Sequence, residues 1–257
     1  MLLLGRQVTV RKISNAFRVE LAKSRAHLLP HGAQHSKYGP RLANRRADQT
    51  FGFCVAGSYG DLIPSVLKSQ RGPFVFLDIG ANVGVFSLVA AGLEGCRRIF
   101  AFEPVPQTFS VLVENIALNR AAKVTPICAA LVSGDETFVH MDYHPEHSGT
   151  SAISDHGGVL ALAMSAPDID KLVGDLPERV VAKIDVEGAE LAVLAALERC
   201  SFFPRLTDII VEVSRLKDSE TADHLLAQIA TLGFQEVRRS TTEPRHYDAH
   251  FRRAGVN

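Results

Sequence analysis

The residues from Phe74 to Gly84 read Phe-Val-Phe-Leu-Asp-Ile-Gly-Ala-Asn-Val-Gly, and the rest of the chain is organised around them. Four apolar residues, aromatic and β-branched among them, lead into Asp78. A run of this kind is typical of a parallel strand that is covered on both faces. The two glycines then permit a tight turn into a helix. This stretch therefore predicts the first strand, turn and helix of an α/β domain.

The turn after this strand predicts a cofactor site. Gly80 can take a positive φ or let a ligand lie against bare backbone, and Gly84 can let the following helix approach closely. Asp78 is expected to direct its carboxylate into the crevice where open α/β sheets bind ligands. Glu103 ends a second apolar run nineteen residues after Gly84, where a carboxylate can accept both hydroxyls of a ribose.

The spacing of the glycines indicates which kind of nucleotide cofactor the turn can bind. A dinucleotide site needs Gly-x-Gly-x-x-Gly, so that backbone amides can surround a pyrophosphate. Here three residues separate Gly80 from Gly84, and Asp78 precedes them. The pattern favours a cofactor with an amino acid end and no phosphate, namely S-adenosylmethionine with S-adenosylhomocysteine as product. The same spacing disfavours an NAD-dependent oxidoreductase. The alternative to a cofactor site is a βαβ unit that binds no cofactor.

Length and charge bound the domain organisation. A chain of 257 residues with 46% hydrophobic content suits one α/β domain with an extension. Residues 1–50 hold ten Lys or Arg against Glu20 and Asp48, a net charge of +8 in a chain with 28 basic and 28 acidic residues. We expect a basic, helical N-terminal extension at 1–50 and a methyltransferase domain at 51–257. The extension is either a solvated amphipathic segment or an arm for an anionic partner.

The cysteines and the hydropathy pattern indicate the compartment. Cys54, Cys96, Cys128 and Cys200 form no CxxC pair, and three of them have apolar neighbours, so we expect reduced thiols and no zinc site. No window approaches the ~18 apolar residues that a membrane helix needs. The sequence therefore predicts a cytoplasmic protein without a membrane span, and it is compatible with a homodimer.

Strand and helix patterns alternate along the chain, which predicts a doubly wound, Rossmann-like sheet. Three expected strands end in acids, at Asp78, Asp185 and Glu212. Because the carboxyl ends of parallel strands lie on one rim, the site should be rich in carboxylates. Methyl transfer is an in-line displacement, and a hydroxyl acceptor needs either a base or a divalent cation that lowers its pKa.

Several residues are candidates for these two roles. For the base, they are His147 and His144 in the polar loop 144–158, and Asp185 or Glu187 after a strand. For a magnesium-like ion, Asp185 and Glu212 end separate strands and could share it. The alternatives are that the histidines are surface loop residues and that the acids are helix caps or ion-pair partners.

Four motifs in order carry a family resemblance: Leu77-Asp78-Ile79-Gly80-Ala81-Asn82-Val83-Gly84, Ala101-Phe102-Glu103-Pro104, Lys183-Ile184-Asp185-Val186-Glu187-Gly188-Ala189-Glu190 and Ile210-Val211-Glu212-Val213. They resemble those of the FkbM family of S-adenosylmethionine-dependent methyltransferases. Ser148-Gly149-Thr150-Ser151 is similar to the small polar loop of that family. The resemblance covers Gly57 to Val213, and the block beginning at Lys183 makes it more specific than a general methyltransferase signal.

The resemblance implies a class I methyltransferase sheet of seven strands with the last one antiparallel, and O-methylation of a sugar or secondary-metabolite hydroxyl. It implies a cofactor pocket and a reaction site. The pocket would comprise Asp78, Gly80, Ala81, Asn82, Gly84, Glu103, Pro104 and Asp185, with Glu103 on the ribose, and Asp185 and Glu187 would lie beside the methyl group or the acceptor. Residues 1–50 match no motif, so the acceptor cannot be inferred.

Two other activities stay open. An N- or carboxyl-methyltransferase on a small molecule or peptide would need little base. An RNA-binding or RNA-methylating protein would use the basic arm. Residues 1–50, however, contain only Phe17 and Tyr38 as aromatic residues, which are few for stacking on bases. Nucleic acid is therefore the less favoured partner, and a small-molecule acceptor the favoured one.

Overall fold

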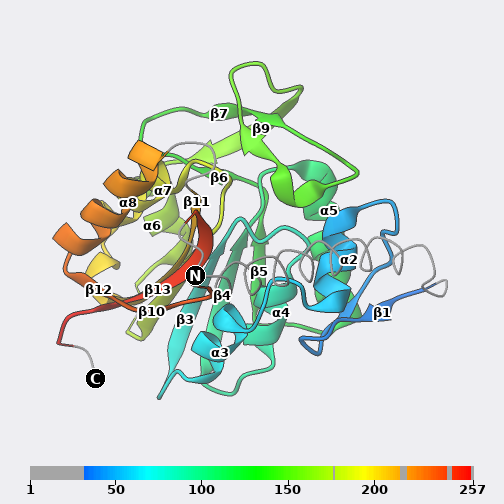
Figure 1. The fold of residues 1–257 in the computed structure, drawn as a ribbon, viewed down its shortest axis with the longest axis horizontal. Helices are drawn as coiled ribbons and strands as arrows, with labels where there is room; N and C mark the ends of the chain where they lie inside the picture. Colours follow the sequence, from blue (N-terminus) through cyan, green and yellow to red (C-terminus); the bar gives the residue numbers. More distant parts are fainter. Residues whose placement is uncertain (1–31, 176, 215–218, 242–244, 256–257) are drawn as a thin grey trace, which may run out of the picture.

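The computed structural model describes residues 32–175, 177–214, 219–241 and 245–255 (Figure 1). Its central sheet has seven strands in the order β12-β13-β11-β10-β3-β4-β5. The bounds of these strands are β3 Phe74–Ile79, β4 Cys96–Phe102, β5 Val124–Ile127, β10 Arg179–Ile184, β11 Leu206–Ser214, β12 Phe234–Arg239 and β13 His246–Arg253. β13 pairs antiparallel with both of its neighbours, whereas β11, β10, β3, β4 and β5 are parallel. The predicted fold class, with its antiparallel last strand, is thereby confirmed.

The direction in which strands are added reverses at the centre of the sheet. From β3 the chain proceeds outward to β4 and β5, and then returns to build β10 and β11 on the other side of β3. The boundary between β3 and β10 is thus the topological switch point, where open α/β sheets bind ligands outside the carboxyl ends of their strands. All six residues of β3 are buried, as a central parallel strand requires.

Helices cover both faces of the sheet (Figure 1). One face packs against α2 (Gln49–Ala56), α3 (Leu62–Lys68), α4 (Val85–Ala91) and α5 (Pro106–Leu118), and the other against α6 (Ala166–Val173), α7 (Glu190–Glu198) and α8 (Ser219–Thr231). Alternate residues of the sheet strands supply the two cores. Phe76 packs in the first core and Leu77 in the second.

A smaller sheet is inserted between β5 and β10, in the order β6-β9-β7-β8. Its strands are β6 Ala130–Leu131, β7 Phe138–Asp142, β8 Ala152–Ile153 and β9 Val159–Met164, and a 3₁₀ turn, η1, spans Ser148–Thr150. The sequence predicts one strand over 124–131, but the structure divides it between the two sheets. β5 is an edge strand, where Pro126 can stand without donating a ladder hydrogen bond, and the chain then leaves the large sheet.

The structure describes the N-terminal part only from residue 32, so most of the helical extension predicted at 1–50 lies outside the described residues. Residues 34–42 form a short antiparallel ladder of β1 (Gln34–His35) and β2 (Arg41–Leu42). The predicted domain boundary at residue 50 falls inside α2, whose N-terminus is capped by the Asp48 side chain. In the described part of the chain, every helix is too short or too polar to cross a lipid bilayer.

Candidate functional site

A cavity opens at the carboxyl ends of β3, β4, β10 and β11, beside the switch point. Most of the predicted site residues line it. They are Gly80, Ala81, Asn82, Glu103, Pro104, Asp185, Glu187 and Glu212. Residues from α2 and from the loop before β8 complete the wall, including Thr50, Ser148 and Gly149. The structure thus brings together residues from four separate strand ends and from several segments distant in sequence.

The glycine turn is pressed against the end of the neighbouring strand. Gly80 has a φ of 75° in the left-handed region, and a Cβ atom at this position would overlap the backbone carbonyl oxygen of Asp185. Only glycine fits such an approach without displacing the backbone. Gly84 lies behind the cavity, where a Cβ atom would overlap the Leu112 side chain of α5. Gly80 therefore shapes the cavity wall, and Gly84 allows a helix to pack behind it.

Glu103 is held at the cavity by backbone amides. Its Oε2 accepts a hydrogen bond from Asn82 N at 3.0 Å, and its Oε1 accepts one from Val105 N at 3.0 Å. The side chain is buried, and this burial raises the pKa of its carboxyl to about 7, although both amide bonds act in the opposite direction. Each oxygen keeps a further lone pair, so the carboxylate has the capacity to accept two more hydrogen bonds.

Asp78 lies beneath the cavity and does not line it. Its side chain is fully buried, with Oδ2 accepting a hydrogen bond from Ser87 Oγ at 2.6 Å and Oδ1 at 3.4 Å from Lys183 Nζ. Lys183 also donates to Gly80 O at 2.8 Å and lies 3.3 Å from Asp185 Oδ2. Burial alone would lower the pKa of the Lys183 ammonium, but the carboxylates of Asp185 and Asp78 raise it above its ordinary value. Lys183 therefore ties β3, the glycine turn and the end of β10 together.

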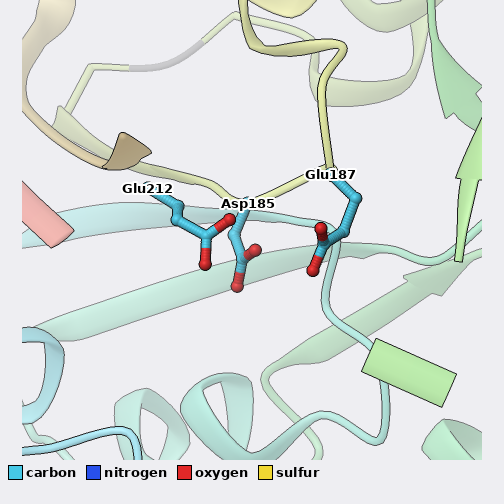
Figure 2. A group of neighbouring side chains, drawn as sticks. All are labelled: Asp185, Glu187 and Glu212. Atoms are coloured by element: carbon cyan, nitrogen blue, oxygen red, sulfur yellow. The ribbon is translucent and has the colours of Figure 1, made fainter. Parts of the chain in front are cut away.

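Three carboxylates converge at one part of the cavity (Figure 2). Asp185, Glu187 and Glu212 each offer an oxygen, and these atoms all lie within 4.8 Å of one another. Burial, reinforced by the charges of Asp185 and Glu187, raises the pKa of Glu212 to about 9. Glu187 has a left-handed backbone with a φ of 56°, which turns the chain after β10 so that its side chain faces the other two. Oxygen ligands so arranged suit a hard divalent cation such as Mg²⁺.

The two histidines that the sequence offers as bases, His144 and His147, do not line this cavity. The ring of His147 packs edge-on against Phe53 of α2 at a centroid distance of 5.7 Å, and His144 pairs with Asp142 at the surface. The loop reaches the site through its backbone turn instead, because Ser148 and Gly149 line the cavity.

Sequence reasoning missed several polar residues that line the cavity or lie directly beside it. Lys183 had a signal, since a lysine inside the apolar run Val-Val-Ala-Lys-Ile-Asp needs a buried partner. Asp48 and Thr50 had the weaker signal of a helix N-cap, which explains a polar residue without pointing to a site. Tyr59 also lines the cavity, and its neighbourhood in the sequence gives no sign of this.

Comparison with known proteins identifies a family for this chain. The model of the methyltransferase FkbM domain matches residues 78–236. The hexuronic acid methyltransferase AglP of Haloferax volcanii is 28% identical over 199 residues, which cover 76% of this chain and 79% of that protein. The 31-O-demethyl-FK506 methyltransferase FkbM of Streptomyces tacrolimicus is 30% identical over 179 residues, covering 57% and 67% of the two chains.

Two solved structures superpose on this chain at low identity. A precorrin-6y C5,15-methyltransferase from Geobacter metallireducens superposes with a TM-score of 0.46 at 18% identity, covering 75% of this chain and 86% of that one. M. jannaschii TYW2 in complex with AdoMet gives a TM-score of 0.46 at 15% identity, covering 88% of each chain. Because the FkbM domain model matches more than half of the residues, the chain belongs to the FkbM family of methyltransferases.

Proposed function

We propose that this protein transfers the methyl group of S-adenosylmethionine to a hydroxyl of a sugar or secondary metabolite. One observation carries the proposal: a single cavity contains both the glycine turn with Glu103 and the three converging carboxylates. The first set has the features of a nucleoside site, and the second set has those of a site that activates a hydroxyl. The relatives named for hexuronic acid and 31-O-demethyl-FK506 support an acceptor of this class.

The cofactor is expected to span the switch point. Glu103 would accept the two ribose hydroxyls, with Pro104 beside the base, and the turn Gly80–Asn82 would hold the methionine end against bare backbone. Asp78 and Gly84 would act from behind this surface, because neither lines the cavity. Asp78 would do so through Lys183, which fixes the Gly80 carbonyl.

The reaction needs a proton acceptor beside the methyl group. Asp185 or Glu187 would take the hydroxyl proton while the acceptor oxygen forms a bond to the methyl carbon. The carbon–sulfur bond breaks with its electron pair remaining on sulfur, so S-adenosylhomocysteine is released. Alignment of the oxygen, the carbon and the sulfur accounts for most of the rate gain in such a displacement. His147 is the less favoured base, since its ring faces Phe53.

Calorimetric titration with S-adenosylmethionine and S-adenosylhomocysteine tests the cofactor assignment. We expect micromolar binding by the wild-type protein, and none by Glu103→Ala. Methyl transfer to matched methyl glycosides, one neutral, one a hexuronate and one an amino sugar, then tests the acceptor by mass spectrometry. Asp185→Asn and Glu187→Gln should lower kcat on a hydroxyl, whereas transfer to an amine would be insensitive to both. A folded wild-type protein that binds neither cofactor form would overturn the assignment.

The three clustered carboxylates also support the proposal that the enzyme binds a divalent cation. Asp185, Glu187 and Glu212 lie within 4.8 Å of one another, and carboxylates are the ligands that Mg²⁺ prefers. The ion would bind the acceptor oxygen and make its proton easier to remove. Titration with MgCl2 should produce a binding signal that Asp185→Asn and Glu212→Gln both abolish. Glu198→Gln, an exposed acid at the end of α7, is the matched control. Full activity in the presence of EDTA would exclude a required ion.

A further inference from the structure

The loop before β8 is fastened to the N-terminus of α2 by one buried carboxylate. Asp48 Oδ2 accepts a hydrogen bond from Ser148 Oγ at 2.6 Å, and Asp48 Oδ1 accepts one from Ser148 N at 3.1 Å. Both residues are buried, with 8% and 5% of their surface exposed. Gly149 N donates to Thr50 Oγ1 at 2.8 Å, which adds a parallel contact between the same two segments. The loop is therefore positioned by residues that precede it by about a hundred positions.

The charge of Asp48 sets the direction of the next hydrogen bond. A serine hydroxyl has one proton, and the short bond to the Asp48 carboxylate uses it. The Ser148 oxygen must then accept, and Asn82 Nδ2 donates to it at 3.2 Å. With Nδ2 donating to Ser148, Asn82 Oδ1 accepts a hydrogen bond from Val83 N at 2.8 Å and lies 3.3 Å from the same Ser148 oxygen.

Asn82 connects this network to the expected ribose site. Its backbone is left-handed, with a φ of 50°, a conformation that asparagine adopts only when local hydrogen bonds favour it. In this conformation Asn82 N donates to Glu103 Oε2 at 3.0 Å. The hydrogen bonds thus run from Asp48 through Ser148 and Asn82 to Glu103, and we call these four residues the relay.

We propose that Asp48 and Ser148 are positioning residues for cofactor binding, which act through Asn82 to hold Glu103 and the glycine turn in the conformation that accepts the ribose of S-adenosylmethionine. The inference rests on the proposed function and extends it to a residue outside the family match, which begins at residue 78. Neither Asp48 nor Ser148 needs to touch the ribose for this effect. Their role is to hold the Asn82 side chain, and with it the backbone turn whose N–H donates to Glu103.

The variant Asp48→Asn separates this role from helix capping. Asp48 also caps α2 by accepting a hydrogen bond from Thr50 N at 2.9 Å, and asparagine is an equally good N-cap. The asparagine NH2 group, however, would donate to Ser148 Oγ and reverse the relay. Ser148→Ala interrupts the relay at its second member. The matched control is Asp61→Asn, since Asp61 is the exposed N-cap residue of α3, makes no side-chain capping bond and does not line the cavity.

Calorimetry with S-adenosylhomocysteine, 5′-methylthioadenosine and adenine gives the decisive readout. We expect Asp48→Asn and Ser148→Ala to raise Kd about tenfold for the two ligands that contain ribose, the effect of one lost charge-assisted hydrogen bond. The Kd of adenine alone should not change, and Asp61→Asn should match wild type throughout. The pH midpoint of S-adenosylhomocysteine binding should also move upward in Asp48→Asn, because the backbone N–H of Asn82 stabilises the Glu103 carboxylate and a displaced turn would weaken that bond.

Each other outcome decides against one specific claim. Wild-type protein that fails to bind S-adenosylhomocysteine would overturn the proposed function itself. Wild-type binding with unchanged Kd in both variants would overturn only the relay. Weaker binding of all three ligands, together with a lower unfolding midpoint of the unliganded variants, would show that Asp48 and Ser148 serve the fold in general, and would also overturn the relay.

Discussion

Glu103 is a buried carboxylate that lines the cavity, and the proposed function gives it the ribose hydroxyls. Burial raises the pKa of its carboxyl to about 7, and the ionised form is the stronger hydrogen-bond acceptor. We therefore expect the affinity for S-adenosylhomocysteine to increase between about pH 6 and pH 8. Glu103→Gln should bind more weakly and show no such step. Calorimetry across this range is the measurement, and a flat wild-type profile would contradict the assignment.

The same raised pKa has the opposite effect on folding. The native protein retains a proton on Glu103 in a range where the unfolded chain has lost it, so the native state binds more protons. From this residue, the free energy of unfolding should fall as pH rises from the ordinary value of 4.5 to about 7, and level off above that. Urea denaturation of unliganded wild type and Glu103→Gln at several pH values measures the difference in slope between the two proteins.

At the scale of elements, the glycine turn between β3 and α4 packs directly against the backbone at the end of β10. Gly80 and Gly60 have φ values of 75° and 76°, but only at Gly80 would a Cβ atom meet other atoms. Gly60→Ala should therefore destabilise by about 1–2 kcal/mol, the strain of a left-handed residue. Gly80→Ala should lower the free energy of unfolding by roughly 3 kcal/mol or more, because overpacking adds to that strain. Equal effects in urea denaturation would show that contact with Asp185 is unimportant.

The connection between β3 and β10 also depends on a buried charge. Lys183 lies between Asp78 and Asp185 with 3% of its side chain exposed. Removing one partner of a buried pair leaves an uncompensated charge, so Lys183→Met should lower the free energy of unfolding by about 3–5 kcal/mol. Lys171→Met removes an exposed pair with Asp168, which water screens, and should leave the free energy of unfolding nearly unchanged. Adding Asp78→Asn to Lys183→Met should restore part of the lost free energy of unfolding. If it restores none, the unpaired Asp78 carboxylate is not the cause of the loss.

At the scale of the whole molecule, the two sheets should differ in stability. β10 is buried along most of its length and pairs with β3 and β11 on either side, whereas three of the five residues of β7 are exposed. Hydrogen exchange is slowest where opening requires global unfolding. We expect the amides of β3, β10 and β11 to exchange with the global free energy of unfolding, and those of β7 and β8 to exchange faster. Equal protection in the two sheets would mean that they unfold as one unit.

The sequence by itself determined the parts of this protein that depend on local pattern and on strand direction. Buried strands can be recognised in the sequence as apolar runs, and parallel strands bring their carboxyl ends to one rim of the sheet. The sequence alone therefore predicted that Glu103, Asp185 and Glu212 lie near one another, and in the structure they line one cavity. The turn at Gly80 was equally predictable, because only glycine tolerates that backbone beside another strand.

Only the tertiary structure decided how side chains distant in sequence pair. Asp48 and Ser148 are separated by 100 positions, and Lys183 meets the Gly80 carbonyl across 103 positions, so no local pattern predicts either contact. The directions of Asp78 and His147 were decided in the same way, since Ser87 and Phe53 give them partners away from the cavity. A motif fixes where the backbone goes, but the free energy of burying a polar side chain depends on whichever neighbours the complete fold provides.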